Sequence, residues 1–214
     1  MSRLRLNISM SLDGFVAGPD QSVERPLGVG GMRLHEWIVP LRAWRRMHGL
    51  DGGEANESTR VVEESLNNIG ATIMGRNMFG GGPGPWDRER PWNGWWGEDP
   101  PFHHPVFVLT HQPRERLELQ GGNSFTFVTE GVASALEQAR RAAGGKDVSL
   151  AGGAKVAQEY LAAGLVDEME IHLVPVLLGS GERLFERIGS DLHGLELVRT
   201  IAAPNVTHLK FVRR

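Results

Sequence analysis

Two glycine motifs offer the clearest sites for chemistry, because each follows a short apolar run and precedes a segment of helical character. The first holds Gly75, Arg76 and Asn77, and the second holds Gly152, Gly153, Ala154 and Lys155. Glycine lets the backbone approach a ligand, N–H groups at a helix start attract phosphate, and a guanidinium can grip a phosphomonoester. Either motif alone is better explained as a tight turn with a solvated arginine. The pair, in this order, predicts a cleft that holds both ends of NADPH.

Aromatic side chains form a second group of candidates. The segment from about 80 to 105 is rich in glycine, proline and tryptophan, and it contains Trp92, Trp96 and Phe102. Planar heterocycles stack well on such rings, so these three side chains are predicted to bind substrate. An equally good explanation is that they seal an interface between subunits, where tryptophan is also enriched. A loop of this length in a compact domain is typical of a functional lid.

Other chemistries lack the residues that they need. The sequence has no cysteine, which excludes disulfides, thiolate zinc sites and cysteine nucleophiles. His35-Glu36 looks like the start of a zinc-protease helix, but Val39 stands where the second ligand is required, so His35 is interpreted as a surface residue. No complete Rossmann glycine pattern, phosphate loop or nucleophile elbow is present. We therefore predict no metal.

Length and composition predict one domain over residues 1–214. The chain is 40% hydrophobic and 23% charged, as is ordinary for a globular protein. No apolar run reaches the roughly 20 residues that cross a bilayer. The net charge of -3 gives no attraction for phosphate backbones. Neither a membrane nor nucleic acid is therefore predicted as a partner, and the absence of cysteine makes the cytoplasm the expected compartment.

Hydrophobic periodicity predicts the elements of the first half. Apolar residues alternate from Leu4 to Met10, which indicates a strand with one buried face. Helical spacing from Leu34 to Trp44 predicts a short amphipathic helix inside an insertion of about 24–56. A second helix is predicted after an N-cap at Asn56 or Ser58, ending near Gly70.

The remaining elements alternate between strand and helix. Strands are predicted at 71–74, 106–110, 125–128 and 148–150, and helices at 133–143 and about 154–163. Residues 169–178 are predicted as the longest strand, and 195–201 with 206–212 as a hairpin around Pro204-Asn205. Parallel βαβ units with an antiparallel C-terminal hairpin predict an α/β fold with a mostly parallel mixed sheet between helical layers.

Four stretches of this sequence resemble the dihydrofolate reductase superfamily over nearly the whole chain. They are Ser11 to Ala17, Ile73 to Arg76, Val108 to Thr110 and Leu150 to Gly153. Within that superfamily, Leu165 to Glu168 and Leu173 to Gly181 look more like the reductase domain of riboflavin biosynthesis (the RibD C-terminal domain) and its uncharacterised bacterial relatives. The resemblance implies the corresponding three-layer α/β/α fold.

The resemblance also implies roles for individual residues. Ser9, Val16 and Ala17 would border the nicotinamide, Gly75, Arg76, Asn77 and Thr110 would hold the adenosine ribose phosphate, and Gly152, Gly153, Ala154 and Lys155 the pyrophosphate. Relatives often place a basic residue after the position of Thr110. This chain has His111 there, so Arg76 must carry most of the preference for NADPH over NADH.

Two carboxylates are candidates for catalysis. Asp13 opens the loop that closes over the nicotinamide in relatives, although Asp-Gly after a strand is foremost a turn signal. Folate reductases keep a carboxylate early in the helix before the Met-Gly-Arg strand, and Thr59 aligns there. Glu57 is the nearby substitute, with a first-turn helix charge as the alternative interpretation.

These features predict an NADPH-dependent reductase that transfers hydride to a small heterocyclic C=N or C=O substrate, pterin-like or pyrimidine-like. One alternative is an NADP(H)-binding protein of the same fold without turnover, prompted by Thr59 in place of a carboxylate. A true dihydrofolate reductase is the other. A homodimer is expected from the relatives and from the aromatic content.

Overall fold

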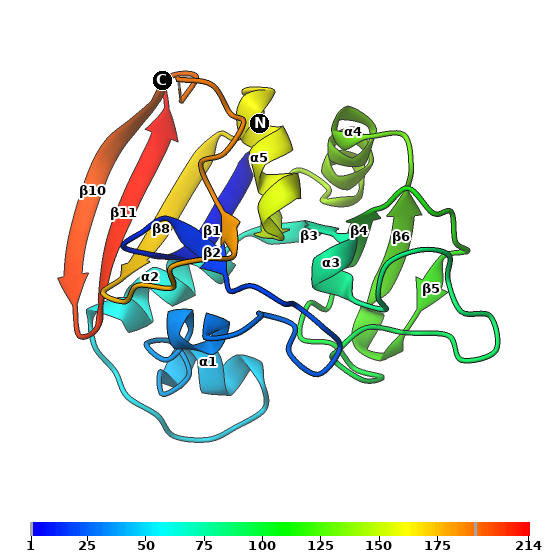
Figure 1. Ribbon diagram of the computed structural model, residues 1–214, viewed down its shortest axis with the longest axis horizontal. Helices are drawn as coiled ribbons and strands as arrows, with labels where there is room; N and C mark the ends of the chain where they lie inside the picture. Colours follow the sequence, from blue (N-terminus) through cyan, green and yellow to red (C-terminus); the bar gives the residue numbers. More distant parts are fainter. Residues whose placement is uncertain (1, 191) are drawn as a thin grey trace.

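A large mixed sheet organises the protein, whose computed structural model describes residues 2–190 and 192–214 (Figure 1). Its strand order in the described residues is β10-β11-β8-β1-β7-β3-β4-β6-β5. The six central strands run parallel: β8 (Glu168–Val174), β1 (Leu4–Ser11), β7 (Asp147–Gly152), β3 (Ile69–Gly75), β4 (Pro105–Leu109) and β6 (Ser124–Val128). The hairpin of β10 (Leu195–Ala203) and β11 (Val206–Arg213) adds antiparallel strands at one edge, and β5 (Leu117–Glu118) adds one at the other. This is the predicted dihydrofolate reductase-like α/β fold.

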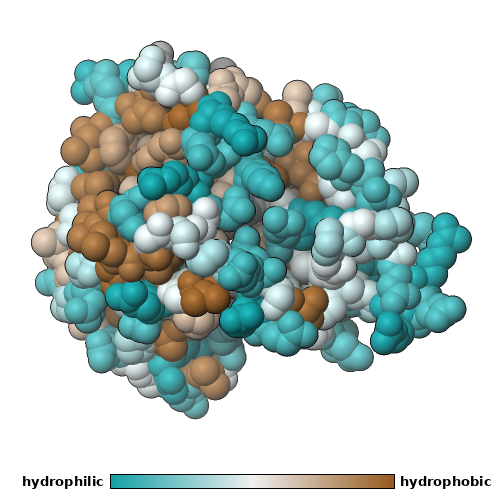
Figure 2. Space-filling model, in the orientation of Figure 1, coloured by the Kyte–Doolittle hydropathy of each residue, from teal (hydrophilic) through white to brown (hydrophobic). Residues whose placement is uncertain are grey.

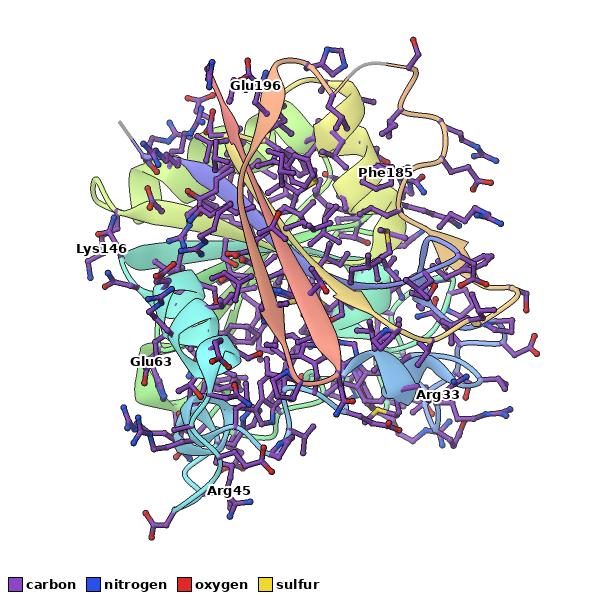
Figure 3. The ribbon with its side chains drawn as sticks, turned by 90° about the vertical axis from the view of Figure 1, so that its left-hand side faces the viewer. Arg33, Arg45, Glu63, Lys146, Phe185 and Glu196 are labelled. Carbon is purple, nitrogen blue, oxygen red and sulfur yellow. The ribbon has the colours of Figure 1, made fainter. Side chains whose placement is uncertain are left out.

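Helices cover both faces of the sheet. The helices α4 (Val132–Ala142) and α5 (Ala154–Ala162) pack on one face, and α2 (Glu57–Leu66), α1 (Arg42–Met47) and the 3-10 turn η1 (Gly31–Leu34) lie on the other. Figure 3 shows α2 and α5 on opposite sides of the strands β10 and β11. Two short elements precede strands of the sheet. The single turn α3 (Arg76–Phe79) comes before β4, and the 3-10 turn η2 (Gln120–Gly122) comes before β6.

Alternation along β1 gives the sheet two different faces. Leu4 and Leu6 are fully buried in the core formed with α4 and α5. The residue between them, Arg5, points the other way: its guanidinium donates to the carboxylate of Glu168 (3.2 Å) and to the backbone oxygen of Glu64 in α2 (2.8 Å). Because successive strand residues face opposite sides, Asn7 and Ser9 follow Arg5 onto the α2 side.

Most predicted elements are present, and two predictions are wrong. The helix expected from Leu34 to Trp44 is a 3-10 turn and a series of turns, and α1 begins only at Arg42. Pro40 explains the break, because proline lacks the N–H that a helix needs and restricts the residue before it. The strand expected at 169–178 ends at Val174, before Pro175, and β10 is longer.

Three short strands escaped prediction. The strands β2 (Phe15–Ala17) and β9 (Glu182–Arg183) form a small separate sheet, and β5 forms one edge of the large sheet. Each is too short for periodicity to reveal. The segment 80–104 has no helix or strand, as predicted, and its aromatic rings pack in a cluster around Phe79 and Phe125.

Candidate active site

A cavity of about 1230 Å³ lies on the α2 side of the sheet. Its floor is the sheet itself, where the strands β8, β1, β7 and β3 present polar side chains to the cavity: Asn7, Ser9, Thr72, Ser149 and His172. The hydroxyl of Thr72 is 2.8 Å from Nε2 of His104, which comes from the segment before β4 and also lines the cavity. The floor therefore offers several hydrogen-bonding groups and, among the described residues, no carboxylate.

The walls of this cavity are largely apolar. They are formed by side chains from the η1–α1 segment, α2, α3 and the aromatic segment: Trp37, Trp44, Val62, Met78, Trp96 and Phe102. A slot with apolar walls and a polar floor suits a flat ring that carries polar atoms along one edge. Trp96 and Phe102, both predicted to bind substrate, line the cavity. Trp92 does not, because its indole N–H donates to the backbone oxygen of Phe79 (2.8 Å) and its ring packs against Trp95.

The charged side chains that line the cavity among the described residues are exposed, apart from the half-buried Glu64. Arg46, Arg60 and Lys146 line it together with the carboxylates of Glu63 and Glu64. Figure 3 shows Glu63 and Lys146 on the same side of the molecule, near α2. Glu64 is paired with Arg199 at 2.7 Å. The interior is thus neutral, which favours an uncharged ring over an ionised one.

The two glycine motifs lie at the carboxyl ends of neighbouring parallel strands. Gly152 ends β7 and Gly75 ends β3, and in the sheet Gly152 pairs with Met74. Thr110 follows the next strand, β4. Ligands of open α/β sheets bind in such a crevice, outside the carboxyl ends of the strands. The structure therefore brings the predicted phosphate-binding residues to one edge of the sheet.

The second motif leaves bare backbone at the start of α5. Gly152 has φ of 127°, which a residue with a side chain rarely adopts, and a Cβ added at Gly153 would meet no atom within 4 Å. Ala154 begins α5 and is buried, whereas Lys155 is exposed. Open space beside backbone N–H groups at a helix N-terminus fits the pyrophosphate of a dinucleotide.

Arg76 is held close to a second cation. Its guanidinium stacks on Trp86, 3.6 Å from the ring centroid, and Arg114 lies over the same ring at 5.1 Å. Burial and the charge of Arg114 lower the pKa of Arg76. Its Nε and Nη2 are buried without a hydrogen-bond partner among the described residues. Two unsatisfied donors on a cation are suited to an anion such as a phosphomonoester.

The remaining predicted cofactor residues lie on β1, β2 and beside the two motifs. Ser9 is buried and accepts a hydrogen bond from Nε1 of Trp37 (3.1 Å). Val16 and Ala17 are buried in β2, and Asn77 is exposed in α3. The hydroxyl of Thr110 accepts from the backbone N–H of Gln112 (3.1 Å).

Asp13 is engaged in hydrogen bonds within the protein. Its carboxylate accepts from the hydroxyl of Ser11 (2.6 Å) and from the backbone N–H groups of Leu178 (3.2 Å) and Gly179 (2.7 Å). These bonds, chiefly the one from Ser11, lower the pKa of Asp13 to about 2. The carboxylate is therefore ionised at neutral pH and joins two loops, which supports the turn interpretation.

Glu57 and Thr59 lie in the first turn of α2. Glu57 is exposed and is not among the residues that line the cavity. Thr59 is buried in a capping box, where its hydroxyl accepts from the backbone N–H of Asn56 (3.1 Å). Val62 is the buried α2 residue that lines the cavity. The position that aligned with the folate-binding carboxylate thus serves the helix cap.

Histidines near the cavity were missed by sequence reasoning. His35, expected at the surface, lines the cavity with a buried Nδ1 that has no partner among the described residues, and burial lowers its pKa. Burial also lowers the pKa of His172 to about 3 and that of His104 to about 4. No local motif marks these residues, because strand register and loop packing bring them together.

Comparisons with known proteins agree with this architecture. A putative riboflavin biosynthesis protein of Shewanella sp. PV-4 is similar with a TM-score of 0.61 at 20% identity, covering 99% of both chains. The deaminase/5-amino-6-(5-phosphoribosylamino)uracil reductase of Thermotoga maritima has a TM-score of 0.57 at 15% identity, and all of this chain matches 57% of that one. Dihydrofolate reductase of Enterococcus faecalis, complexed with NADP(H), has a TM-score of 0.52 at 13% identity, covering 99% of this chain and 96% of that one.

The strand order and the similar structures thus define a dihydrofolate reductase-like α/β fold. Residues 2–209 match the model of the RibD C-terminal domain, so the chain belongs to that family. Among the described residues, no helix has the length and apolar character to cross a membrane.

Proposed function

We propose that this protein is an NADPH-dependent reductase that transfers hydride to a small, neutral heterocycle at a C=N or C=O bond. One observation carries the proposal: the phosphate-binding motifs and the cavity adjoin. Met78, in the turn that Arg76 begins, lines the cavity, as does Ala151, which precedes Gly152. A dinucleotide held by the motifs would therefore end beside the cavity, where a substrate ring is to be placed.

The family and the similar proteins support the reaction class. The Thermotoga maritima protein is named a uracil reductase, and the Enterococcus faecalis enzyme is a reductase complexed with NADP(H). When bound, NADPH would supply hydride from its nicotinamide ring. The residues of this chain would hold the phosphates at Arg76 and Gly153, exclude water with Trp96 and Phe102, and orient the substrate on the polar floor.

The substrate class follows from the cavity. Its apolar walls could stack a flat ring, its floor could bond to ring heteroatoms and exocyclic oxygens, and the carboxylates that line it, Glu63 and Glu64, are exposed or half-buried. A pterin-like or pyrimidine-like ring meets those conditions. Among the described residues the floor has no carboxylate, which makes a true dihydrofolate reductase the weaker candidate. The second candidate function is NADP(H) binding without turnover, which the lack of a described carboxylate on the floor also favours.

The decisive experiment is titration of the purified protein with NADPH and with NADH, followed by tryptophan quenching. The matched variants are Arg76→Ala, which removes the stacked guanidinium, and Arg33→Ala, an exposed arginine outside the cavity. Loss of charged hydrogen bonds predicts roughly 10- to 100-fold weaker NADPH binding in Arg76→Ala only. Absence of binding by the wild type would refute the proposal, and binding without oxidation of a heterocycle panel would favour the second candidate.

Dimerisation belongs to the same proposal and rests on different features. Leu197 and Val198 of the edge strand β10 are exposed by 53% and 52%. Figure 2 shows hydrophobic side chains gathered on the side of the molecule where β10 and β11 lie, whereas the opposite end is hydrophilic. A monomeric mass by light scattering would refute the homodimer.

A further inference from the structure

A chain of three polar groups leads from α2 to the floor of the cavity. The hydroxyl of Ser58, in the first turn of α2, is 2.8 Å from Nε2 of His208 on β11. Nδ1 of His208 is in turn 2.8 Å from Nδ1 of His172 on β8. All three residues are at least 93% buried, since their exposed fractions are 1%, 1% and 7%. His172 is the member that lines the cavity.

The available hydrogen-bond donors and acceptors determine where the protons lie on Ser58, His208 and His172. Ser58 makes no other side-chain hydrogen bond among the described residues, so its buried hydroxyl proton has one acceptor, Nε2 of His208. His208 then carries its proton on Nδ1 and donates it to Nδ1 of His172. A neutral His172 must consequently carry its own proton on Nε2.

The opposite arrangement is disfavoured. If His172 donated from Nδ1, His208 would donate from Nε2 to Ser58, and the serine proton would be buried without an acceptor. An orphaned buried donor costs about 1–3 kcal/mol, enough to make that arrangement a minor one. Ser58 therefore selects the tautomer of a ring that it does not touch.

The surroundings keep both rings neutral and in place. Trp37 packs against His172 and His208, with ring centroids 4.8 and 5.1 Å apart. Burial lowers the pKa of His172 to about 3, and charge on His208 or His35 acts in the same direction. Burial also lowers the pKa of His208 to about 4, and the charge of Arg199 on β10 adds to that effect. Nε2 of His172 has no hydrogen-bond partner within the described chain, and the cavity lies beside this residue.

We propose that His172 is a fixed hydrogen-bond donor on the cavity floor, and that it selects ligands whose ring edge carries an acceptor, a carbonyl oxygen or an unprotonated ring nitrogen. An amino group at the same place would meet a second donor and be rejected. The inference deepens the proposed reductase function by defining one edge of its substrate. The proton position itself does not depend on that function.

The proton position is measured by NMR of the ligand-free protein with ¹⁵N-labelled histidine rings. We expect Nε2–H for His172 and Nδ1–H for His208. In Ser58→Ala the constraint is removed, and a mixture of tautomers is expected in both rings, whereas Ser134→Ala on the opposite face leaves them unchanged. A wild-type His172 protonated on Nδ1 would overturn the inference, whether or not any variant folds.

The hydrogen bond that His172 would donate is measured with 6-methylpterin and 5-aminouracil, both of which carry ring carbonyls, in the presence of NADP⁺. Loss of one buried hydrogen bond predicts about tenfold weaker binding to His172→Ala, with partial recovery in His172→Gln, whose amide can donate. Affinity for NADPH should change by less than about twofold, because Arg76 and Gly153, which would hold its phosphates, follow β3 and β7, whereas His172 is on β8.

The outcomes separate the two proposals. Unchanged heterocycle affinity in His172→Ala would overturn selection by His172. Failure of the wild type to bind NADPH or either heterocycle would overturn the reductase function and the selection with it, and the tautomer measurement would still decide the proton position.

Discussion

The two faces of the central sheet differ in the kind of side chain that they present. On the face covered by α4 and α5, the neighbouring strands β1, β3 and β7 present apolar side chains such as Leu6, Ile73 and Leu150, all fully buried. On the other face, the next residue along β1 and the preceding one along β7 are Asn7 and Ser149, which line a cavity. The same strands therefore build a packed core and a binding floor one residue apart.

The difference shows how stability and recognition are divided within one sheet. Burial of apolar surface stabilises the fold without regard to direction, whereas hydrogen-bonding groups select a ligand by position. Because the side-chain period of a strand is two, each function takes alternate residues, and a register slip of one would exchange them.

The largest expected effect comes from a matched pair on β7. Leu150→Ala should lower the free energy of unfolding by about 2–5 kcal/mol, since it opens a void in a fully buried core. Its neighbour Ser149 makes no side-chain hydrogen bond among the described residues and faces the cavity, so Ser149→Ala should cost less than about 1 kcal/mol. Urea denaturation of both variants measures the contrast. Equal losses would mean that the polar floor is as important for folding as the core.

The second expected effect is a loss of folding stability in acid that arises from His172 on the polar face. His172 has a folded pKa of about 3 against an ordinary 6.5, so the unfolded chain binds a proton more readily between these values. Its contribution to stability is complete above pH 6.5 and is lost as the pH falls toward 3. Between pH 7.5 and 5, the wild type should therefore lose about 2 kcal/mol more than His172→Gln. Parallel losses in the two proteins would show that His172 titrates normally.

Sequence reasoning predicted the apolar face better than the polar one. The strands of the core and the helices after them follow from local periodicity and from glycine at Gly75 and Gly152. The floor does not, because His172 meets His208 only through the pairing of β8 with β11, far apart in sequence. The helix expected from Leu34 to Trp44 was predicted wrongly, since Pro40 interrupts its helical spacing. Thr59, which aligned with the folate-reductase carboxylate, caps α2, and Val62 lines the cavity instead, because the rotation of α2 is set by packing.

A smaller effect tests whether the start of α2 is structural. The side-chain oxygen of Asn56 accepts from the backbone N–H of Ser58 (2.9 Å), and Thr59 completes the capping box. Asn56→Ala should lower the free energy of unfolding by about 1 kcal/mol, the usual cost of a lost cap. Urea denaturation measures it. Because Ser58 begins the hydrogen-bond chain to the floor, the histidine tautomers should be checked in the same variant, and a large change there would couple the cap to the cavity.

The smallest expected effect distinguishes a charge that assists the helix from one that assists catalysis. Glu57 is exposed beside the start of α2, where a negative charge interacts favourably with the helix dipole, and it lies outside the cavity. Glu57→Gln should therefore cost only a few tenths of a kcal/mol and leave NADPH oxidation and its pH profile unchanged. The measurement is steady-state turnover across pH with the heterocycle panel. A lost limb of the pH profile would instead establish the catalytic role predicted from the sequence, and would require α2 to move toward the cavity when substrate binds.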